Sequence, residues 1–238
     1  MEFRIRAARV LVLAAAIFCV PACGGSDDDE ESLVVTFTSP ANLDGGVPRQ
    51  PVIYVRFNKP LKPGSVTEAN FVLLNSLSAA IPRDVSYSGC LNEVRIVPDA
   101  ALTKSAVYQV SLTSLIEATD DTTYAGGFFQ FTIGTSDDAD RPTFSGATAA
   151  GSPTSTSIAL TWAAATDATS SVVFDVFLST TTGCHDLTDA FLAGQPGPLG
   201  VTVTGLTAAT TYFFVVRARD DFGNVDLNVQ EQSATTLP

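Results

Sequence analysis

The feature that most constrains this chain is a two-residue alternation of apolar and polar side chains, which recurs in short runs from residue 33 onward. Ile53, Val55 and Phe57, for example, share one face of an extended strand, while the residues between them occupy the other. No stretch of ten or more residues in this part carries helical periodicity. The sequence therefore predicts an all-β fold built from sheets that each bury one face.

The strand-like runs form two sets of similar size. The first set is at 33–38, 51–60, 71–74, 94–97, 107–113 and 128–133, and the second at 157–162, 172–178, 200–204, 211–219 and 229–235. Six or seven strands in about 100 residues is typical of an immunoglobulin-like sandwich. The polar segment GTSDDADRPTF between the sets is typical of a domain boundary. We therefore predict two tandem immunoglobulin-like sandwiches at 33–135 and 143–238, joined by an acidic linker at 136–142.

Both halves contain the spacing Leu-x5-Tyr just before a long apolar strand. The pairs are Leu102 with Tyr108, and Leu206 with Tyr212. In Greek-key sandwiches a tyrosine at this position hydrogen-bonds back across the corner between two strands. These four residues are therefore predicted to be structural.

The second half resembles a fibronectin type III domain, in the segments SIALTW, VVFDVFLS, VTGLTAATTYFFVVRARDDFGN and SATTLP. The resemblance implies that Trp162 is a structural core residue at the end of the second strand. The first half resembles bacterial immunoglobulin-like modules of surface-layer and adhesin proteins. This second resemblance rests on a Pro-x-x-x-Gly turn, the run FNKPL and the Leu-x5-Tyr corner.

The N-terminus has the three parts of a secretory signal: a basic start, an apolar run at 10–18, and VPA before Cys23. The segment resembles a bacterial lipoprotein signal peptide at 1–22, which implies lipidation of Cys23 by acyl chains such as palmitate. Cys19 competes poorly because bulky Phe18 precedes it. An ordinary secreted protein is the alternative. Residues 23–32 then form the lipidated cysteine and a short acidic tether.

Charge restricts the possible partners. The chain has a formal net charge of −12, which argues against nucleic acid and against electrostatic binding to anionic lipids. We expect attachment to a membrane through the N-terminal lipid alone. The expected location is extracytoplasmic, at the cell envelope. The outer membrane or the cell surface is favoured, because Gly24, directly after Cys23, does not provide one retention cue known from lipoproteins of enteric bacteria.

Of four cysteines, only Cys90 and Cys184 remain after removal of the signal peptide and lipidation of Cys23. They fall in different halves, and nothing in the sequence places them within disulfide reach. Two separate thiols are therefore expected, with an interdomain disulfide as the alternative.

Catalytic motifs are sparse. His185 is the single histidine, so a two-histidine zinc site cannot form. Cys184 and His185 are adjacent, so a cysteine-based hydrolase is the one class of enzyme that these residues suggest. Neighbouring residues in an extended loop, however, point in opposite directions. We therefore expect no enzyme and no cofactor beyond a structural Ca²⁺.

Acidic residues in and near the linker suggest where such a Ca²⁺ ion would bind. Loops at one end of the second sandwich should meet the linker, and carboxylates that converge there suit Ca²⁺. The candidate ligands are Asp137, Asp138, Asp140, Asp167, Asp220 and Asp221. The alternative is a solvated acidic hinge.

The sequence thus favours a lipid-anchored, non-catalytic binding, adhesion or display module with a protein or glycan partner. Phe222, Phe191 and Leu192 are the candidate binding residues. A passive spacer or envelope-assembly component is the alternative.

Overall fold

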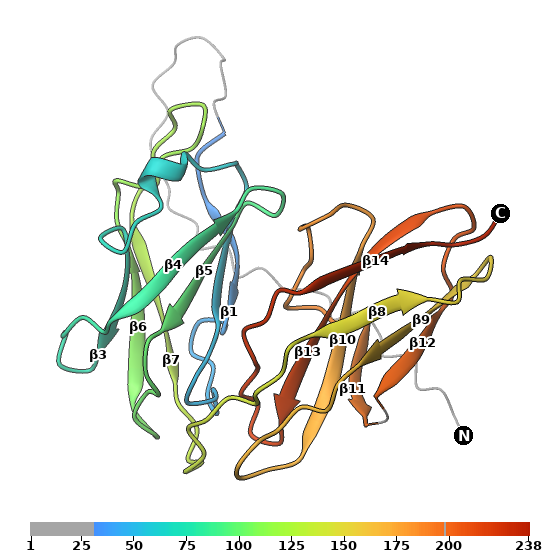
Figure 1. Cartoon of the computed structure of the whole chain (residues 1–238). Helices are drawn as coiled ribbons and strands as arrows, with labels where there is room; N and C mark the ends of the chain where they lie inside the picture. The colour runs from blue at the N-terminus through green and yellow to red at the C-terminus, as the bar shows by residue number, and fades with distance from the viewer. Residues whose placement is uncertain (1–30, 198) are drawn as a thin grey trace. The chain divides into compact units, whose positions relative to one another are not determined.

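The computed structural model describes residues 31–197 and 199–238 (Figure 1). The predicted signal peptide at 1–22, the lipidation site Cys23 and most of the predicted tether lie outside these residues. Within the described residues, no helix has the length and apolar character needed to span a membrane.

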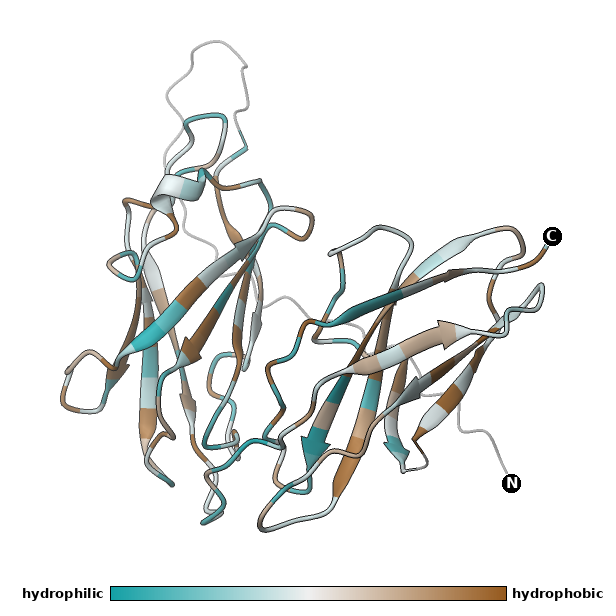
Figure 2. Ribbon diagram, viewed as in Figure 1, coloured by the Kyte–Doolittle hydropathy of each residue, from teal (hydrophilic) through white to brown (hydrophobic). Residues whose placement is uncertain are grey.

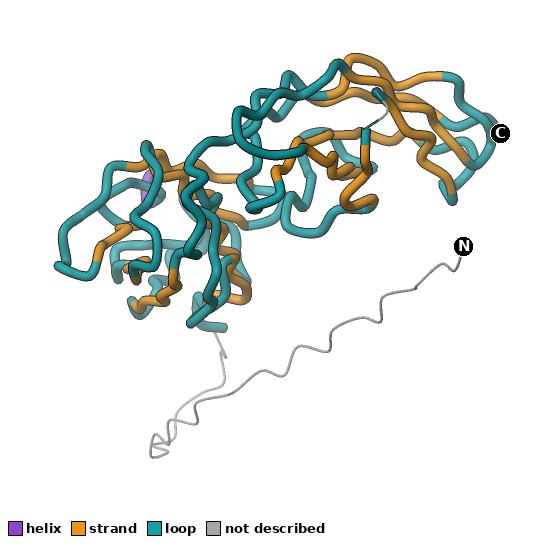
Figure 3. The backbone as a smooth tube through the Cα atoms, turned by 90° about the horizontal axis from the view of Figure 1, so that it is seen from below, coloured by secondary structure: helices purple, strands orange, loops and turns teal. Residues whose placement is uncertain are grey.

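The first half is a β-sandwich of seven strands. They are β1 (Val35–Ser39), β2 (Ile53–Phe57), β3 (Phe71–Asn75), β4 (Arg83–Ser88), β5 (Glu93–Pro98), β6 (Val107–Leu112) and β7 (Gly127–Thr132). One sheet has the order β1-β2-β5-β4 and the other the order β3-β6-β7, with all neighbours antiparallel. A single 3₁₀ turn, Pro63–Ser65, is the helical element that Figure 3 shows among the strands.

The second half is also a seven-stranded sandwich. Its strands are β8 (Ala147–Gly151), β9 (Ser157–Trp162), β10 (Val172–Ser179), β11 (Leu192–Pro196), β12 (Gly200–Thr204), β13 (Thr211–Asp220) and β14 (Glu231–Thr235). The sheet β12-β9-β8 packs on the sheet β11-β10-β13-β14. The prediction of an all-β chain with two tandem sandwiches is confirmed.

Each sandwich has its own apolar core, which Figure 2 shows as brown bands along the strands. In the first core, Ile53, Val55 and Phe57 point inward as the alternation predicts. In the second core the ring of Trp162 lies 5.2 Å from that of Phe174. Burying such side chains is the dominant favourable contribution to folding.

The two tyrosines of the Leu-x5-Tyr pairs make equivalent contacts. The Tyr108 hydroxyl accepts a hydrogen bond of 3.0 Å from the backbone N–H of Thr103. The Tyr212 hydroxyl accepts one of 2.9 Å from the N–H of Thr207. Both rings are buried, so each hydroxyl satisfies a backbone donor at the turn before β6 or β13.

These corners generate a stability prediction. Tyr108→Phe or Tyr212→Phe should lower the free energy of unfolding by about 1–3 kcal/mol, because a backbone N–H loses its acceptor. Urea denaturation followed by intrinsic fluorescence measures the change. Tyr124→Phe is the matched control, since no hydrogen bond involves the Tyr124 hydroxyl within the described part of the chain. Equal losses in all three variants would contradict the role of the corner hydrogen bonds.

Candidate functional site

The outer face of β10 and β13 is buried, although the other face of the same strands already packs into the second core. Phe174, Val176, Phe214 and Val216 point into that core. On the opposite face Asp175, Phe177, Val215 and Arg217 are also buried. A sheet of an isolated sandwich would expose this face to water. The cover comes from the first sandwich, whose Tyr54 lines a cavity together with Phe177 and Arg217.

Arg141 and Gln50 join the sandwiches at one end of this junction. The Arg141 guanidinium donates to Gln50 Oε1 at 2.8 Å, to the Val225 carbonyl at 2.6 Å and to the Pro51 carbonyl at 3.3 Å. The Gln50 N–H donates to Asn224 Oδ1 at 3.2 Å. Burial, together with the nearby positive charges of two further arginines, lowers the pKa of Arg141 to about 10.

Arg56 joins the sandwiches nearer the other end. Its Nε lies 2.7 Å from Glu93 Oε2, and its Nη2 pairs with Asp186 of the second sandwich. The guanidinium also lies over the Phe37 ring, 4.6 Å from the centroid. Burial raises the pKa of Glu93, even though the hydrogen bond from Arg56 acts to lower it.

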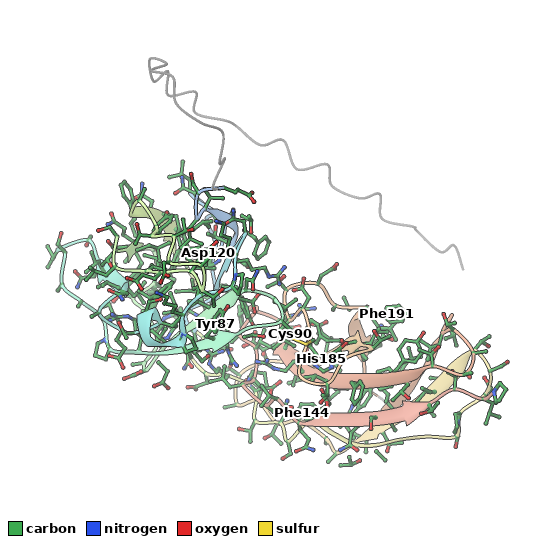
Figure 4. The ribbon with its side chains drawn as sticks, turned by 90° about the horizontal axis from the view of Figure 1, so that it is seen from above. Tyr87, Cys90, Asp120, Phe144, His185 and Phe191 are labelled. Carbon is green, nitrogen blue, oxygen red and sulfur yellow. A yellow bond between two sulfur atoms is a disulfide. The ribbon has the colours of Figure 1, made fainter. Side chains whose placement is uncertain are left out.

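Cys90 and Cys184 form a disulfide across the junction, with their Cα atoms 5.8 Å apart. The expectation of two separate thiols is therefore wrong, and the alternative of an interdomain disulfide is correct. The physical reason is the packing of the two sandwiches, which brings the β4–β5 turn onto the loop after β10. Thr182 and the Gly183 N–H hold that loop by donating to Glu231. Figure 4 shows the sulfur bond beside Cys90 and His185.

The disulfide also bears on the adjacent cysteine and histidine that were considered as a catalytic pair. Cys184 Sγ is bonded to Cys90, so it is not a free nucleophile. His185 is 8 % exposed, its Nδ1 lies 3.6 Å from Glu231 Oε2, and its Nε2 has no hydrogen-bond partner in the described residues. The sequence neighbours Cys184 and His185 do not form a nucleophile and base.

Three of the six candidate calcium ligands come together. Oxygens of Asp138, Asp167 and Asp220 lie within 4.8 Å of one another. The carboxylates of the other three are not part of this group: Asp137 pairs with Lys104, Asp140 is exposed, and Asp221 accepts a 2.6 Å hydrogen bond from the Ser171 hydroxyl. The predicted site is thus reduced to three residues.

Most oxygens of this acidic group already accept hydrogen bonds. Asp220 accepts from the N–H groups of Phe222 and Asn224 and from the Asn224 amide. Asp138 accepts from the Thr169 hydroxyl. Asp167 Oδ2, by contrast, is buried and has no partner in the described residues. Burial raises the pKa of Asp220, and the nearby charge of Asp138 adds to the rise.

The candidate binding residues lie in different settings. Phe222 is 46 % exposed and Phe191 48 % exposed. Phe222 sits over a hollow of about 550 Å³ that Asp138 and Thr169 also line. Leu192 packs against the second core, so it contributes to stability, and of the three candidates only the two phenylalanines are exposed.

A second hollow at the junction is a cavity of about 380 Å³ between the two sandwiches, lined by Tyr54, Phe177, Arg217 and Arg219 among others. Sequence analysis did not find these residues. The sequence does carry a signal for a buried outer face. In VVFDVFLS and in TYFFVVRARD, apolar residues occupy both faces of the strand instead of alternating with polar ones. Continuous apolar runs of this kind indicate strands that are buried on both sides.

Comparison with known families identifies the class of the first sandwich. Residues 29–133 match the family model described as the bacterial Ig-like domain. The matched segment ends one residue beyond β7, so it covers the whole first sandwich.

Parts of three curated bacterial enzymes are similar to this chain. Endoglucanase B of Cellulomonas fimi is 36 % identical over 101 residues, which is 42 % of this chain and 9 % of the enzyme. Exoglucanase B of the same species is 38 % identical over 104 residues, 43 % of this chain and 9 % of the enzyme. Chitinase D of Niallia circulans is 36 % identical over 83 residues, 35 % of this chain and 14 % of the enzyme. The chain therefore matches only a small part of each relative.

Solved structures show more distant similarity. The N-terminal part of the S-layer protein SbsC has a TM-score of 0.38 and 11 % identity, covering 87 % of this chain and 44 % of that one. The sixth fibronectin type III domain of the human fibronectin type III domain containing protein 3 has a TM-score of 0.33 and 19 % identity, covering 44 % and 93 %. The fold assignment therefore rests on the strand pairings of this chain itself.

The disulfide generates a prediction about stability. Replacing both Cys90 and Cys184 by serine should lower the free energy of unfolding by about 2–5 kcal/mol, because the bond closes a long loop in the unfolded chain. Urea denaturation of the wild type with and without reductant, and of the double variant, measures the loss. The double variant should not respond to reductant. Labelling of both cysteines by a thiol reagent in the native, unreduced protein would contradict the bond.

The acidic group generates a prediction about calcium. Millimolar Ca²⁺ should raise the melting temperature, because an ion that binds only the folded state stabilises it. Asp167→Asn should abolish the shift, whereas Asp137→Asn, at an exposed residue paired with Lys104, should keep it. Binding should weaken as the pH falls through the raised pKa of Asp220, since a proton competes with the ion. Absence of both calorimetric heat and a melting shift in the wild type would contradict the site.

Proposed function

We propose that this chain is a lipid-anchored, extracytoplasmic protein of the bacterial cell envelope, and that its two sandwiches form one non-catalytic binding or display unit. The observation that carries the proposal is the Cys90–Cys184 disulfide across the junction. Structural disulfides persist in oxidising compartments outside the bacterial cytoplasm and are rare within it. The signal-like segment before Cys23 independently favours export.

The junction favours a rigid unit over two flexibly linked domains. Interfaces between domains within a chain usually permit relative motion unless they are large and apolar. Here a covalent bond, the Arg56–Asp186 ion pair and the Arg141 hydrogen bonds all cross the same interface. The unit would therefore present its loops in a fixed arrangement, while the acidic segment before residue 33 supplies reach from the membrane.

The similarity to parts of two glucanases and a chitinase favours a glycan over a protein as the partner. The chain matches 9–14 % of those enzymes, a share that corresponds to an accessory module and not to a whole catalyst. The exposed rings of Phe191 and Phe222 offer apolar faces of the kind that bind at such surfaces. A passive spacer, the alternative, would need neither ring.

The anchoring part of the proposal is tested by Cys23→Ala in the native bacterium. The variant should move from the membrane fraction to the soluble extracytoplasmic fraction, because no acyl chain can then hold it. Antibody labelling of intact and permeabilised cells distinguishes surface display from a periplasmic location. Cys19→Ala is the matched control and should remain membrane-bound. Retention of Cys23→Ala in the membrane, or release of Cys19→Ala, would refute lipidation at Cys23.

A further inference from the structure

One sheet of the first sandwich, β3-β6-β7, exposes an uncharged face to solvent. Its three strands, FVLLN, VYQVSL and GFFQFT, contain no acidic or basic residue, although 16 % of the whole chain is charged. Alternate side chains of these strands pack into the first core, so the remaining ones form the outer face. On that face the Phe128 side chain is 64 % exposed.

The contact with the second sandwich is made by the other sheet of the first sandwich. β2 belongs to that other sheet; its residue Tyr54 lines the junction cavity, and its residue Arg56 pairs with Asp186. The outer face of β3-β6-β7 is therefore not the face that the junction buries. Since charged side chains normally occupy exposed positions, their absence from this face has a cause other than burial.

The strand register sets neutral polar side chains beside the Phe128 ring. Ser111 of β6 lies directly opposite Phe128 of β7, and Gln109 lies opposite Gln130 in the next row. Val72 of β3 lies on the other side of Ser111. The Cβ atoms of directly opposite residues are about 5 Å apart, so amide, hydroxyl and apolar groups alternate across one continuous surface.

The polar groups of this surface are available to a ligand. The side chains of Gln109, Ser111 and Gln130 make no hydrogen bond within the described residues, and their polar atoms are accessible to solvent. Each amide and each hydroxyl can both donate and accept. A molecule that lies on the face can therefore hydrogen-bond with them without breaking a bond inside the protein.

The lack of charge and the small area restrict the kind of partner. A phosphate, a carboxylate or an organic cation would lose hydration here and find no opposite charge. The three strands present roughly 300 Å², well below the ~800 Å² per partner of a stable protein–protein interface, which argues against a second copy of the chain. A neutral sugar chain combines apolar ring faces with hydroxyl groups, so it matches both kinds of group on this surface.

We propose that the outer face of β3-β6-β7 binds a neutral glycan, whose sugar rings lie on Phe128 and whose hydroxyl groups hydrogen-bond with the neighbouring amide and hydroxyl side chains. The inference rests on the glycan partner of the proposed function. It places the main contact on the first sandwich, away from the exposed rings of the second. Single contacts of this size are weak, and several copies on one membrane would strengthen attachment to a polymeric glycan.

Cellohexaose, a neutral and extended β-1,4-glucan, is the probe. The β-1,4-glucuronate hexamer has the same backbone with a carboxylate on each ring and is its charged counterpart. Isothermal titration of the full-length chain with its disulfide intact should show millimolar binding of cellohexaose. Binding of the glucuronate should be at least about tenfold weaker, because its carboxylates would be desolvated without a partner.

Three variants locate the contact. Phe128→Ala should weaken cellohexaose binding about tenfold, since the sugar ring loses its stacking surface, and Gln109→Ala should weaken it about threefold through a lost hydrogen bond. Phe222→Ala, which removes an exposed ring of the second sandwich, should retain the affinity of the wild type. Because Phe128 is mostly exposed, Phe128→Ala should melt at the temperature of the wild type, which shows that it folds.

A measurement on the wild type needs no variant. Cellohexaose should shift the side-chain amide NMR resonances of Gln109 and Gln130 in a saturable way and leave those of Gln230, in the second sandwich, unchanged. Absence of both this shift and a titration heat would overturn the inference, whereas the lipid anchor is tested separately at Cys23.

Two further results would overturn it in distinguishable ways. If Phe222→Ala abolished binding and Phe128→Ala did not, the glycan partner of the proposed function would stand and the sheet surface would be wrong. If sedimentation showed dimers that Phe128→Asp abolishes, the face would belong to a second copy of the chain.

Discussion

The structure depends on one packing arrangement, in which the outer face of β10 and β13 is covered by the first sandwich. This contact buries a face of the sheet that an isolated sandwich would expose to solvent. It brings Cys90 to Cys184, places Arg56 beside Asp186 and encloses Arg217. Without it each sandwich would retain its own core, but the Cys90–Cys184 bond and the Arg56–Asp186 pair could not form.

The junction contains more charged groups than is usual for the interior of a protein. Burying Asp175, Arg217 and Asp226 removes their hydration, and burial of ion pairs alone often fails to repay that cost. Two features compensate here. Asp175 and Asp226 accept hydrogen bonds from backbone N–H groups as well as from side chains, and the disulfide limits the freedom of the separated state. The orientation of the contact is set by the groups that cross it, the Cys90–Cys184 disulfide and the Arg56–Asp186 pair.

The alternation of side chains was enough to predict the class of fold and most strands. The predicted runs 157–162 and 200–204 coincide with β9 and β12. β4, β8 and β11 were missed. ATAAG and LAGQP consist mainly of small residues, glycine and proline, and RDVSYS contains only two apolar residues, so these segments carry little alternation. The acidic loops were placed close enough for Asp138, Asp167 and Asp220 to be named, since the ends of a sandwich follow from strand order. The junction was missed because contact between two domains leaves no local periodicity, and the disulfide depends on that contact.

Arg217 shows where local sequence rules stop applying. In an isolated sandwich its position on the outer face of β13 would be ordinary, because an arginine that alternates with apolar residues normally faces water. The flanking residues Val215 and Phe177 on that face are apolar and buried, however, and they indicate that water is absent there. Asp175 opposite it is held by Arg219, but Asp226 Oδ1 lies 3.5 Å from Arg217 Nε and is also buried, so the charge has an ionic partner within the second sandwich. The arginine is therefore kept inside this face by a carboxylate from the segment after β13, a contact that strand alternation does not reveal.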